Sequence, residues 1–490
     1  MANWLDRAIS WVDPNVGIRR ARARALLSYE AIRSERRQGG WTTTGTSGNA
    51  EIGVALSKIR NNARDMVRNN SYARRAVNEW TKRVVGYGIT PAAKTGDPEL
   101  DKRINERWEI WVNRCSSDQR LNFYAAQKLL VGTHFVSGEA LVRMYTRRPE
   151  DGLLVPFQIQ LLEPDYLDTS KTETTSNGYI IQGIQFDKIG RIVGYWLFGN
   201  HPGDTLQTSL RGGYTSAFVS AQDILHHVEI DRMGDVRGMS RFAPVLNKLR
   251  DIDEYADAEI VRKKTEACLT AMVTQPDGQD GATMGPTAMD SSGNKIESFT
   301  PAMVMYGGPG ADVKFFAPAV GGDYALHKET ELREVAVGLG IPYILLDDNL
   351  RAVNYSSFRG GLIAYRDTIE EYRWNWLIPQ ALDPIWRRFI DTLYLAGEIP
   401  EKIYGVQWNP PPFTLLDREA EAEADRMELA LGKKTWPQLI GETGEDAERQ
   451  LEEIASWKSR LDDAGVTFAS SITKSGADND RKDDASSASN

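Results

Sequence analysis

The chain has 490 residues, of which 41% are hydrophobic and 26% are charged, and its formal net charge is −9. These ordinary globular values exclude a fibrous or wholly disordered protein, and the length allows roughly two or three domains with buried cores. The two cysteines, Cys115 and Cys268, lie too far apart in sequence to indicate a disulfide framework or a thiolate metal site, so a reducing cytoplasm fits best.

The first part of the chain is predicted to be mostly helical. The arginine-rich segment 19–38 is typical of a basic helix, and the Gly/Thr/Ser-rich stretch after it is typical of a loop. Residues 56–89 predict two helices with a break near the sequence RNNS, and Gly86 and Gly88 are expected to end the second. Further helical patterns cover 99–114 and 122–138.

Strands are predicted next, between 155 and 230, where β-branched and aromatic residues are separated by Gly, Asp and Asn. The sequence FDKIGR at 186–191 is typical of a turn that joins two strands. A long helix of about thirty residues is then predicted from Ser240. The Gly-, Pro-, Asp- and Ser-rich residues 275–322 that follow predict a small projecting subdomain.

Helical patterns return in the last third of the chain. A second helix is predicted at 324–340, and a long aromatic helix at 362–397 is expected to be interrupted at Pro379 and Pro384. Acidic helices come next, and the polar residues 469–490 are predicted to be disordered.

The sequence offers little support for catalysis or metal binding. The five histidines form no metal-binding pair at helical spacing, and the adjacent His226 and His227 are predicted to point to opposite faces of a strand, one packed and one exposed. Ser356 and Ser357 have no base nearby in sequence, and the glycine-rich residues 307–312 lack the Gly-Lys-Ser/Thr of a phosphate-binding loop. We therefore expect no catalytic residue, no metal ligand and no cofactor.

Five stretches, taken in chain order, together resemble the lambda-type portal protein of tailed bacteriophages. The first is an arginine-rich helix followed by VVGYGI, and the fourth carries NYSSFRGG, close to a pattern that the family usually writes as NYSSxRxG. Each stretch alone is modest, but their common order makes the resemblance specific, and it extends over nearly all of residues 15–468. The stretches are 59–91, 161–204, 234–267, 333–362 and 429–457.

The resemblance implies an α+β portal fold and a ring, typically a dodecamer, at one vertex of the capsid. It implies that double-stranded DNA passes through a central channel, independently of sequence, during packaging and ejection. The implied partners are other copies of the chain, the terminase large subunit, a head–tail connector or adaptor, and the major capsid or scaffold protein. The implied location is the virion, after assembly in the host cytoplasm. No membrane partner is expected, because the longest apolar run, near 336–346, is too short to span a bilayer.

The resemblance also divides the chain into the named parts of a portal subunit. The wing contains the N-terminal helices and the β body, the stem consists of two helices, and the clip is a small α/β insert between them. A tunnel loop, a return helix with a hinge, a helical crown and a disordered tail come after the stem. The expected boundaries are 1–239 for the wing, 240–273 and 323–345 for the stem helices, 274–322 for the clip, 346–356 for the tunnel loop, 357–416 for the return helix and hinge, 417–468 for the crown and 469–490 for the tail.

Two groups of residues are candidates for contact with DNA or with neighbouring subunits. A channel must let a polyanion slide, and each phosphate neutralised by a cation adds affinity, so mixed charge and few cations suit weak, sequence-blind contact. Arg351 and Asn354 are the residues that we most expect to touch phosphate. The tunnel-loop candidates are Asp347, Asp348, Asn349, Leu350, Arg351 and Asn354. The stem and oligomer candidates are Arg250, Asp253, Glu254, Glu259, Lys263 and Lys264.

Two other functions remain open at this point. The chain could be a Mg²⁺-dependent nuclease or phosphodiesterase that uses Asp347, Asp348 and other carboxylates, although such pairs are common on acidic surfaces. It could also be a different ring-forming virion protein, such as a connector. The length of the chain and the order of helix, insert, helix and loop argue against a connector, since connectors are usually much smaller.

Overall fold

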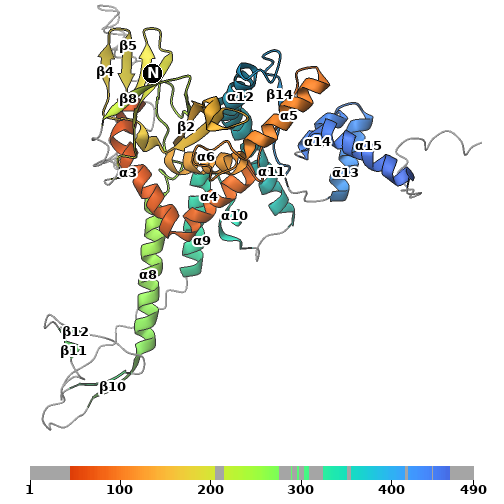
Figure 1. The fold of residues 1–490 in the computed structure, drawn as a ribbon. Helices are drawn as coiled ribbons and strands as arrows, with labels where there is room; N and C mark the ends of the chain where they lie inside the picture. The colour runs from red at the N-terminus through yellow and green to blue at the C-terminus, as the bar shows by residue number, and fades with distance from the viewer. Residues whose placement is uncertain are drawn as a thin grey trace, which may run out of the picture. The chain divides into compact units, whose positions relative to one another are not determined.

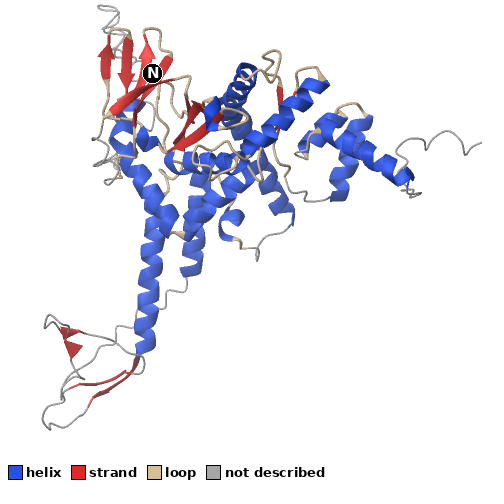
Figure 2. Ribbon diagram, in the orientation of Figure 1, coloured by secondary structure: helices blue, strands red, loops and turns tan. Residues whose placement is uncertain are grey.

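The computed structural model describes residues 45–204, 215–274, 288–289, 295–296, 303–307, 324–349, 355–413, 418–443 and 445–463. The chain divides into two units, Met1–Glu51 and Ile52–Asn490, and the features below belong to the second unit apart from the start of the first helix. The fold is α+β, with helices interspersed among small, mostly antiparallel sheets (Figure 1 and Figure 2). No helix within the described ranges is long and apolar enough to span a bilayer.

Several predicted features lie outside the described residues, so the structure does not test them. They are the basic helix 19–38, most of the predicted clip 274–322, the tunnel-loop candidates Leu350, Arg351 and Asn354, and the tail 469–490.

Four helices open the described chain: α3 (Gly48–Asn69), α4 (Ser71–Val84), α5 (Pro98–Val112) and α6 (Phe123–Ser137). The predicted break near RNNS is confirmed, because Asn70 separates α3 from α4 and caps α4 through its side chain. Gly86 and Gly88 end the run as predicted, since their φ values of +55° and +133° lie in a region that L side chains rarely adopt.

Two antiparallel sheets follow the helices. The first has the strand order β3–β2–β9, with β2 at Glu139–Thr146, β3 at Phe157–Leu162 and β9 at Ile224–Val228. The second runs from β4 to β8 in sequence order, and the predicted turn at FDKIGR is confirmed as the connection between β6 and β7. Its strands are β4 (Glu173–Thr175), β5 (Gly178–Ile181), β6 (Ile184–Asp187), β7 (Ile192–Phe198) and β8 (Ser216–Ser220). Two short 3-10 helices, η3 (Pro149–Asp151) and η4 (Pro164–Tyr166), lie before and after β3.

Two helices, α8 (Leu246–Cys268) and α9 (Tyr324–Leu339), lie side by side (Figure 1). Lys248 of α8 forms ion pairs with Glu331, at 3.0 Å, and with Glu334 of α9. The contact is therefore made by charge as well as by packing.

Helix α8 is shorter at both ends than the sequence pattern predicts. Ser240 begins a set of turns instead of the helix, and its hydroxyl accepts a hydrogen bond of 3.1 Å from the Phe242 backbone N–H. Strand β10 (Leu269–Thr274) begins directly after α8, because the β-branched residues of LTAMVT favour extended backbone. β10 pairs in parallel with β13 (Met303–Gly307), and β11 (Ala288–Met289) pairs with β12 (Lys295–Ile296).

The aromatic helix does not break at Pro379 and Pro384, so that prediction is wrong. Helix α11 (Tyr355–Tyr372) passes into a π-helical stretch (Arg373–Leu382), which passes directly into α12 (Asp383–Leu395). A proline ring clashes with the carbonyl four residues back in an α-helix, and the wider π turn accommodates Pro379 without ending the helix. Pro384 is the second residue of α12, directly after the point at which π-helical backbone returns to α-helical backbone.

The remaining elements are a strand and three helices. Strand β14 (Val406–Asn409) pairs antiparallel with β1 (Thr90–Ala93), so the chain returns to the N-terminal helices after α12. The predicted acidic helices are present as α13 (Arg418–Ala430), α14 (Trp436–Glu442) and α15 (Ala447–Asp463). Thr435 and Gln438 form a capping box at the start of α14.

The core is rich in aromatic side chains from segments far apart in the sequence. Trp111 of α5 stacks on Phe157 of β3, with ring centroids 5.2 Å apart, and its indole N–H donates to the Phe157 carbonyl. Trp108 lies 5.2 Å from Trp386 of α12. Packing of this kind holds the helices against the three-stranded sheet. The main buried aromatic residues are Trp80, Trp108, Trp111, Phe123, Phe135, Phe157, Tyr372, Trp386 and Phe389.

Candidate functional site

The predicted tunnel-loop residues begin in a helix. Asp347 is the last residue of the short helix α10 (Tyr343–Asp347), and its carboxylate accepts a hydrogen bond of 2.9 Å from the Tyr343 hydroxyl. Burial, and then this bond to Asp347, raise the pKa of Tyr343. Asp348 is the C-cap of α10, with a left-handed φ of +58°. The expectation that Asp347 lies in a loop is therefore wrong, because Leu345 and Leu346 pack into the core and extend helical backbone to this point.

An arginine that the sequence reading missed holds the end of α10. Arg75 of α4 donates from Nε to the Leu345 carbonyl at 2.7 Å, and its Nη2 lies 2.7 Å from Asp348 Oδ1. The carbonyls in the last helical turn have no partner within the helix, and they form the negative end of the helix dipole. Arg75 stands among several arginines in sequence, so no local signal distinguishes it.

Asp253, one of the stem candidates, makes its contact within the chain. Both of its carboxylate oxygens accept hydrogen bonds of 2.9 Å from Nδ2 of Asn70, the N-cap of α4. Asn70 was not among the functional residues expected from the sequence, although the predicted helix break near RNNS includes it. The structure thus brings α8 and α10 to the same helix, α4.

The other stem candidates lie along α8 and pair mostly with each other or with near neighbours on the helix. Arg250 donates to Glu254 at 2.7 Å, and Glu259 accepts from Arg262 and lies 3.9 Å from Lys263. Lys264 is exposed. Spacings of three and four residues bring opposite charges together on one helix face. The surface of α8 is therefore charged but locally balanced.

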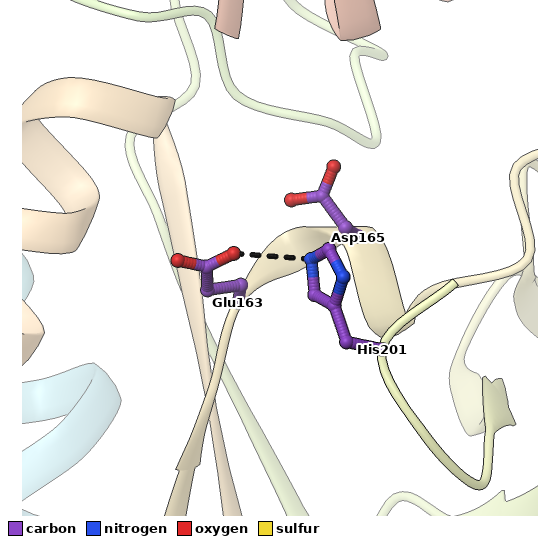
Figure 3. A group of neighbouring side chains, drawn as sticks. All are labelled: Glu163, Asp165 and His201. Carbon is purple, nitrogen blue, oxygen red and sulfur yellow. Dashed lines mark ion pairs between the residues drawn. The ribbon is translucent and has the colours of Figure 1, made fainter. Parts of the chain in front are cut away.

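Glu163, Asp165 and His201 form a cluster whose possible ligand atoms lie within 4.8 Å of one another (Figure 3). In the described part of the chain, it is the one group of at least three potential metal ligands. Asp347 and Asp348 belong to no such group among the described residues.

The bonding within this cluster favours an ion-pair network over a metal centre. Arg64 pairs with Asp165 and lies 3.3 Å from Glu163. His201 Nδ1 accepts a hydrogen bond of 3.0 Å from the Gly203 backbone N–H. Its Nε2 lies 3.2 Å from Glu163 Oε2 (Figure 3), at ion-pair distance but without a hydrogen bond to any described residue.

A second network surrounds the buried carboxylate of Glu139 on β2. It accepts hydrogen bonds from Arg60 at 3.0 Å, from Arg237 Nε at 2.9 Å and from His226 at 2.8 Å. Burial alone would raise the pKa of Glu139, but the charge of Arg237 and the bond from His226 outweigh it and hold the pKa well below its usual range. The Glu139 carboxylate is therefore ionised inside the fold.

The side chains of the two adjacent histidines of β9 are both shielded from solvent, which corrects the expectation that one is exposed. They do point to opposite faces, as predicted: His226 contacts Glu139, and His227 lies 2.7 Å from the Tyr372 hydroxyl. The His226 side chain retains only 4% exposure, because Tyr195 of the second sheet packs against its ring. Sequence could not show this, since the covering strand lies in another sheet.

Tyr372 links two buried histidines across the core. Its hydroxyl lies 2.7 Å from His227 Nε2 and 3.0 Å from His134 Nδ1. Burial lowers the pKa of both histidines, that of His227 to about 3. Both rings are therefore neutral near pH 7, and the hydroxyl can donate to one ring and accept from the other. The second nitrogen of each ring, His134 Nε2 and His227 Nδ1, is buried without a hydrogen bond to any described residue.

The chain is similar to a curated phage protein and to chains of solved particles. The curated probable portal protein of Halomonas phage phiHAP-1 is 23% identical over 465 residues, which cover 90% of this chain and 88% of that protein. A chain in the solved virion of the native gene transfer agent particle is 15% identical, with a TM-score of 0.41, and the match covers 80% of this chain and 90% of that chain. A chain in the neck of the empty gene transfer agent particle, computed with C6 symmetry, gives a TM-score of 0.43 at 15% identity, with the same coverage of 80% and 90%.

The family assignment rests on a match to a family model. The model of the family described as phage portal protein, lambda family, matches residues 34–373. The match takes in α3 to α11 and the residues of both networks around Glu139 and Tyr372. Because it spans well over half of the chain, the protein belongs to the lambda family of phage portal proteins, as the resemblance in its sequence implied.

Proposed function

We propose that this portal protein forms a homo-oligomeric ring at one vertex of the capsid and conducts double-stranded DNA through its central channel during packaging and ejection. The observation that carries the proposal is the family match, which includes the helix α8, the insert after it, the helix α9 and the segment after α10 in one colinear order. In the proposal the ring also provides the docking site for the terminase, a connector or adaptor, and capsid or scaffold protein.

The proposed parts correspond to elements of the fold. The helices α3 to α6 and the two antiparallel sheets form the wing, and α8 and α9 form the stem. The strands β10 to β13 belong to the clip, the segment after α10 to the tunnel loop, and α13 to α15 to the crown. The balanced charges of α8 support a passive role, because cations that pair within the helix, as Arg250 and Arg262 do, add little affinity for phosphate.

The ring is tested by imaging the purified full-length protein with negative-stain microscopy and by measuring its native mass. We expect closed rings with a central hole wide enough for duplex DNA, since a head-to-tail interface that closes gives a cyclic assembly. A protein that stays monomeric under every solution condition would contradict the proposal.

The tunnel loop is tested by deleting Leu350–Val353. Rings should still form, but the DNA packaged or retained in assembled heads should fall. A deletion of equal length within 469–490 is the matched control and should leave packaging unchanged. Wild-type packaging in both variants would exclude a tunnel-loop role for this segment.

The nuclease alternative has its own test, in which Mg²⁺-dependent cleavage of plasmid DNA is measured for the wild-type protein and for Asp347→Ala. The proposal expects no cleavage by either protein. The Asp347 carboxylate already accepts from Tyr343, and Asp348 already pairs with Arg75, so neither side chain is arranged to bind Mg²⁺. Cleavage that is lost in Asp347→Ala would favour the nuclease.

A further inference from the structure

Helix α4 contacts two elements that lie far from it in the sequence. Asn70 reaches Asp253 of α8, and Arg75 reaches Leu345 and Asp348 at the end of α10. We infer that Asn70 and Arg75 are positioning residues that hold the start of the segment after α10 at a fixed place relative to α8. The inference rests on the proposed function, in which that segment meets DNA and α8 belongs to the stem.

The Asn70 side chain makes two kinds of contact at once. Its Oδ1 accepts from the Ala73 backbone N–H at 2.8 Å and caps α4, while its Nδ2 donates to both oxygens of Asp253 at 2.9 Å. Asn70 is only 3% exposed and its cap bond to Ala73 is buried, whereas Asp253 is exposed and its bonds to Asn70 are part-buried. A shift of α8 at Asp253 therefore breaks the bonds to Asn70 or moves the start of α4.

Arg75 fixes the other end of this connection. Its two contacts, to the Leu345 carbonyl and to the Asp348 carboxylate, close the C-terminus of α10. Asp348 has a left-handed backbone conformation, so it is the residue at which the chain turns away from the helix. The backbone conformation at the end of α10 is thus fixed next to Arg75.

The two contacts share one rigid support. Ala73, Ala76, Trp80 and Val84 are fully buried along one face of α4, which anchors the helix in the core. At about 1.5 Å of rise per residue, Asn70 and Arg75 lie only about 7–8 Å apart along the helix axis. Over so short a length the helix does not bend appreciably, so α8 and Asp348 cannot shift independently of each other.

The first test measures hydrogen–deuterium exchange of the full-length assembled protein. In Arg75→Ala, the amides of 345–349 should exchange roughly three- to tenfold faster than in the wild type, because two contacts to this segment are lost. The matched control is Arg74→Ala, which removes the neighbouring exposed arginine, a side chain that contacts the Val67 carbonyl instead. The melting temperature should be similar in the two variants. Unchanged exchange at 345–349 in Arg75→Ala would overturn the inference.

The second test exchanges the roles of a donor and an acceptor. Asn70→Asp keeps an oxygen that caps α4 but places a carboxylate against Asp253. Exchange at 345–349 should rise, and the double variant Asn70→Asp/Asp253→Asn should restore it, since residue 253 now donates and residue 70 accepts. A cap defect alone would not respond to the change at Asp253. Failure of the double variant to restore slow exchange would overturn the inference.

DNA packaging by the same variants separates the inference from the proposed function. If exchange at 345–349 rises in Arg75→Ala and packaging stays at the wild-type level, the positioning role holds and the contact of this segment with DNA is excluded. If deletion of Leu350–Val353 impairs packaging while Arg75→Ala changes neither exchange nor packaging, the proposed function holds and the positioning role is excluded.

Discussion

Arg237 and Glu139 form an ion pair from which solvent is fully excluded, with Arg237 Nε 2.9 Å from both carboxylate oxygens. The pair joins the loop before α8 to strand β2, and Arg60 of α3 and His226 of β9 complete the contacts around the carboxylate. A buried ion pair is stable only while each partner remains, because a single buried charge has no water to solvate it. The network therefore fixes the relative positions of α3, β2, β9 and the loop before α8.

Glu139→Gln should lower the free energy of unfolding by about 3–5 kcal/mol, because it leaves Arg237 and Arg60 buried without an opposite charge. Urea denaturation with a constant slope measures the loss. Glu254→Gln, which breaks the exposed pair with Arg250, serves as the control and should cost less than about 1 kcal/mol. Equal losses in the two variants would contradict the assigned importance of the buried network.

Acid should destabilise the protein through His134 and His227. Burial lowers the pKa of both, that of His227 to about 3, whereas an unfolded histidine titrates near about 6.5. Between these values the unfolded chain binds protons that the folded chain does not. The free energy of unfolding should therefore fall with decreasing pH below about 6.5, by up to about 1.4 kcal/mol per pH unit for each histidine.

The variant His227→Gln isolates this effect, because glutamine can still bond to the Tyr372 hydroxyl but does not titrate. Its unfolding free energy, measured between about pH 7 and pH 4, should depend less steeply on pH than that of the wild type. If the two proteins show the same slope, His227 does not contribute to acid sensitivity.

Gly138→Ala should be strongly destabilising, because the added Cβ would lie 2.3 Å from the backbone carbon of Met239. Gly152→Ala isolates the cost of backbone conformation: Gly152 also has a positive φ, of +67°, but a Cβ there meets nothing within 4 Å. Gly152→Ala should lower the free energy of unfolding by about 1–2 kcal/mol. Gly138→Ala should lower it by about 1–3 kcal/mol more, as measured by thermal or urea unfolding. Equal costs would show that residue 239 can move aside freely.

Trp386→Ala should lower the free energy of unfolding by about 3–5 kcal/mol, because it empties a large volume beside Trp108 and Phe389. Trp457→Ala on α15 is the matched control, since its side chain is half exposed, and it should change stability by less than about 1 kcal/mol. A small loss in Trp386→Ala would mean that the aromatic cluster can collapse into the space.

Local features of the fold were predictable where a few neighbouring residues decide the backbone. The break at Asn70, the glycine ends at Gly86 and Gly88 and the turn at 186–191 depend on capping and on φ preference, which act within a few residues. The ends of α8 were less predictable, because helical and extended backbone compete closely near Leu269. The predicted helix break at Pro379 was wrong, because π-helical backbone, which accommodates this proline, is rare. Buried side chains hold this stretch in the core.

In the candidate site, too, the order of the elements was predictable from the sequence, whereas the contacts between them were not. The order of helix, insert, helix and segment could be read from the sequence, and α8, α9 and α10 follow one another along the chain. The contacts of Arg75 with Leu345 and of Asn70 with Asp253 join residues that are 270 and 183 positions apart. No local pattern specifies which of many arginines will reach a carbonyl so distant along the chain.

The sequence by itself determined the family, the helical and strand segments and the charge pattern of α8, because each of these is recorded in neighbouring residues or in their order. Only the tertiary structure decided that the side chains of His226 and His227 are both shielded from solvent, that Glu139 is ionised in the core, and that α4 holds α8 and α10 together. The physical reason is that burial, desolvation and long-range hydrogen bonds depend on what packs against a residue, and that partner comes from elsewhere in the chain.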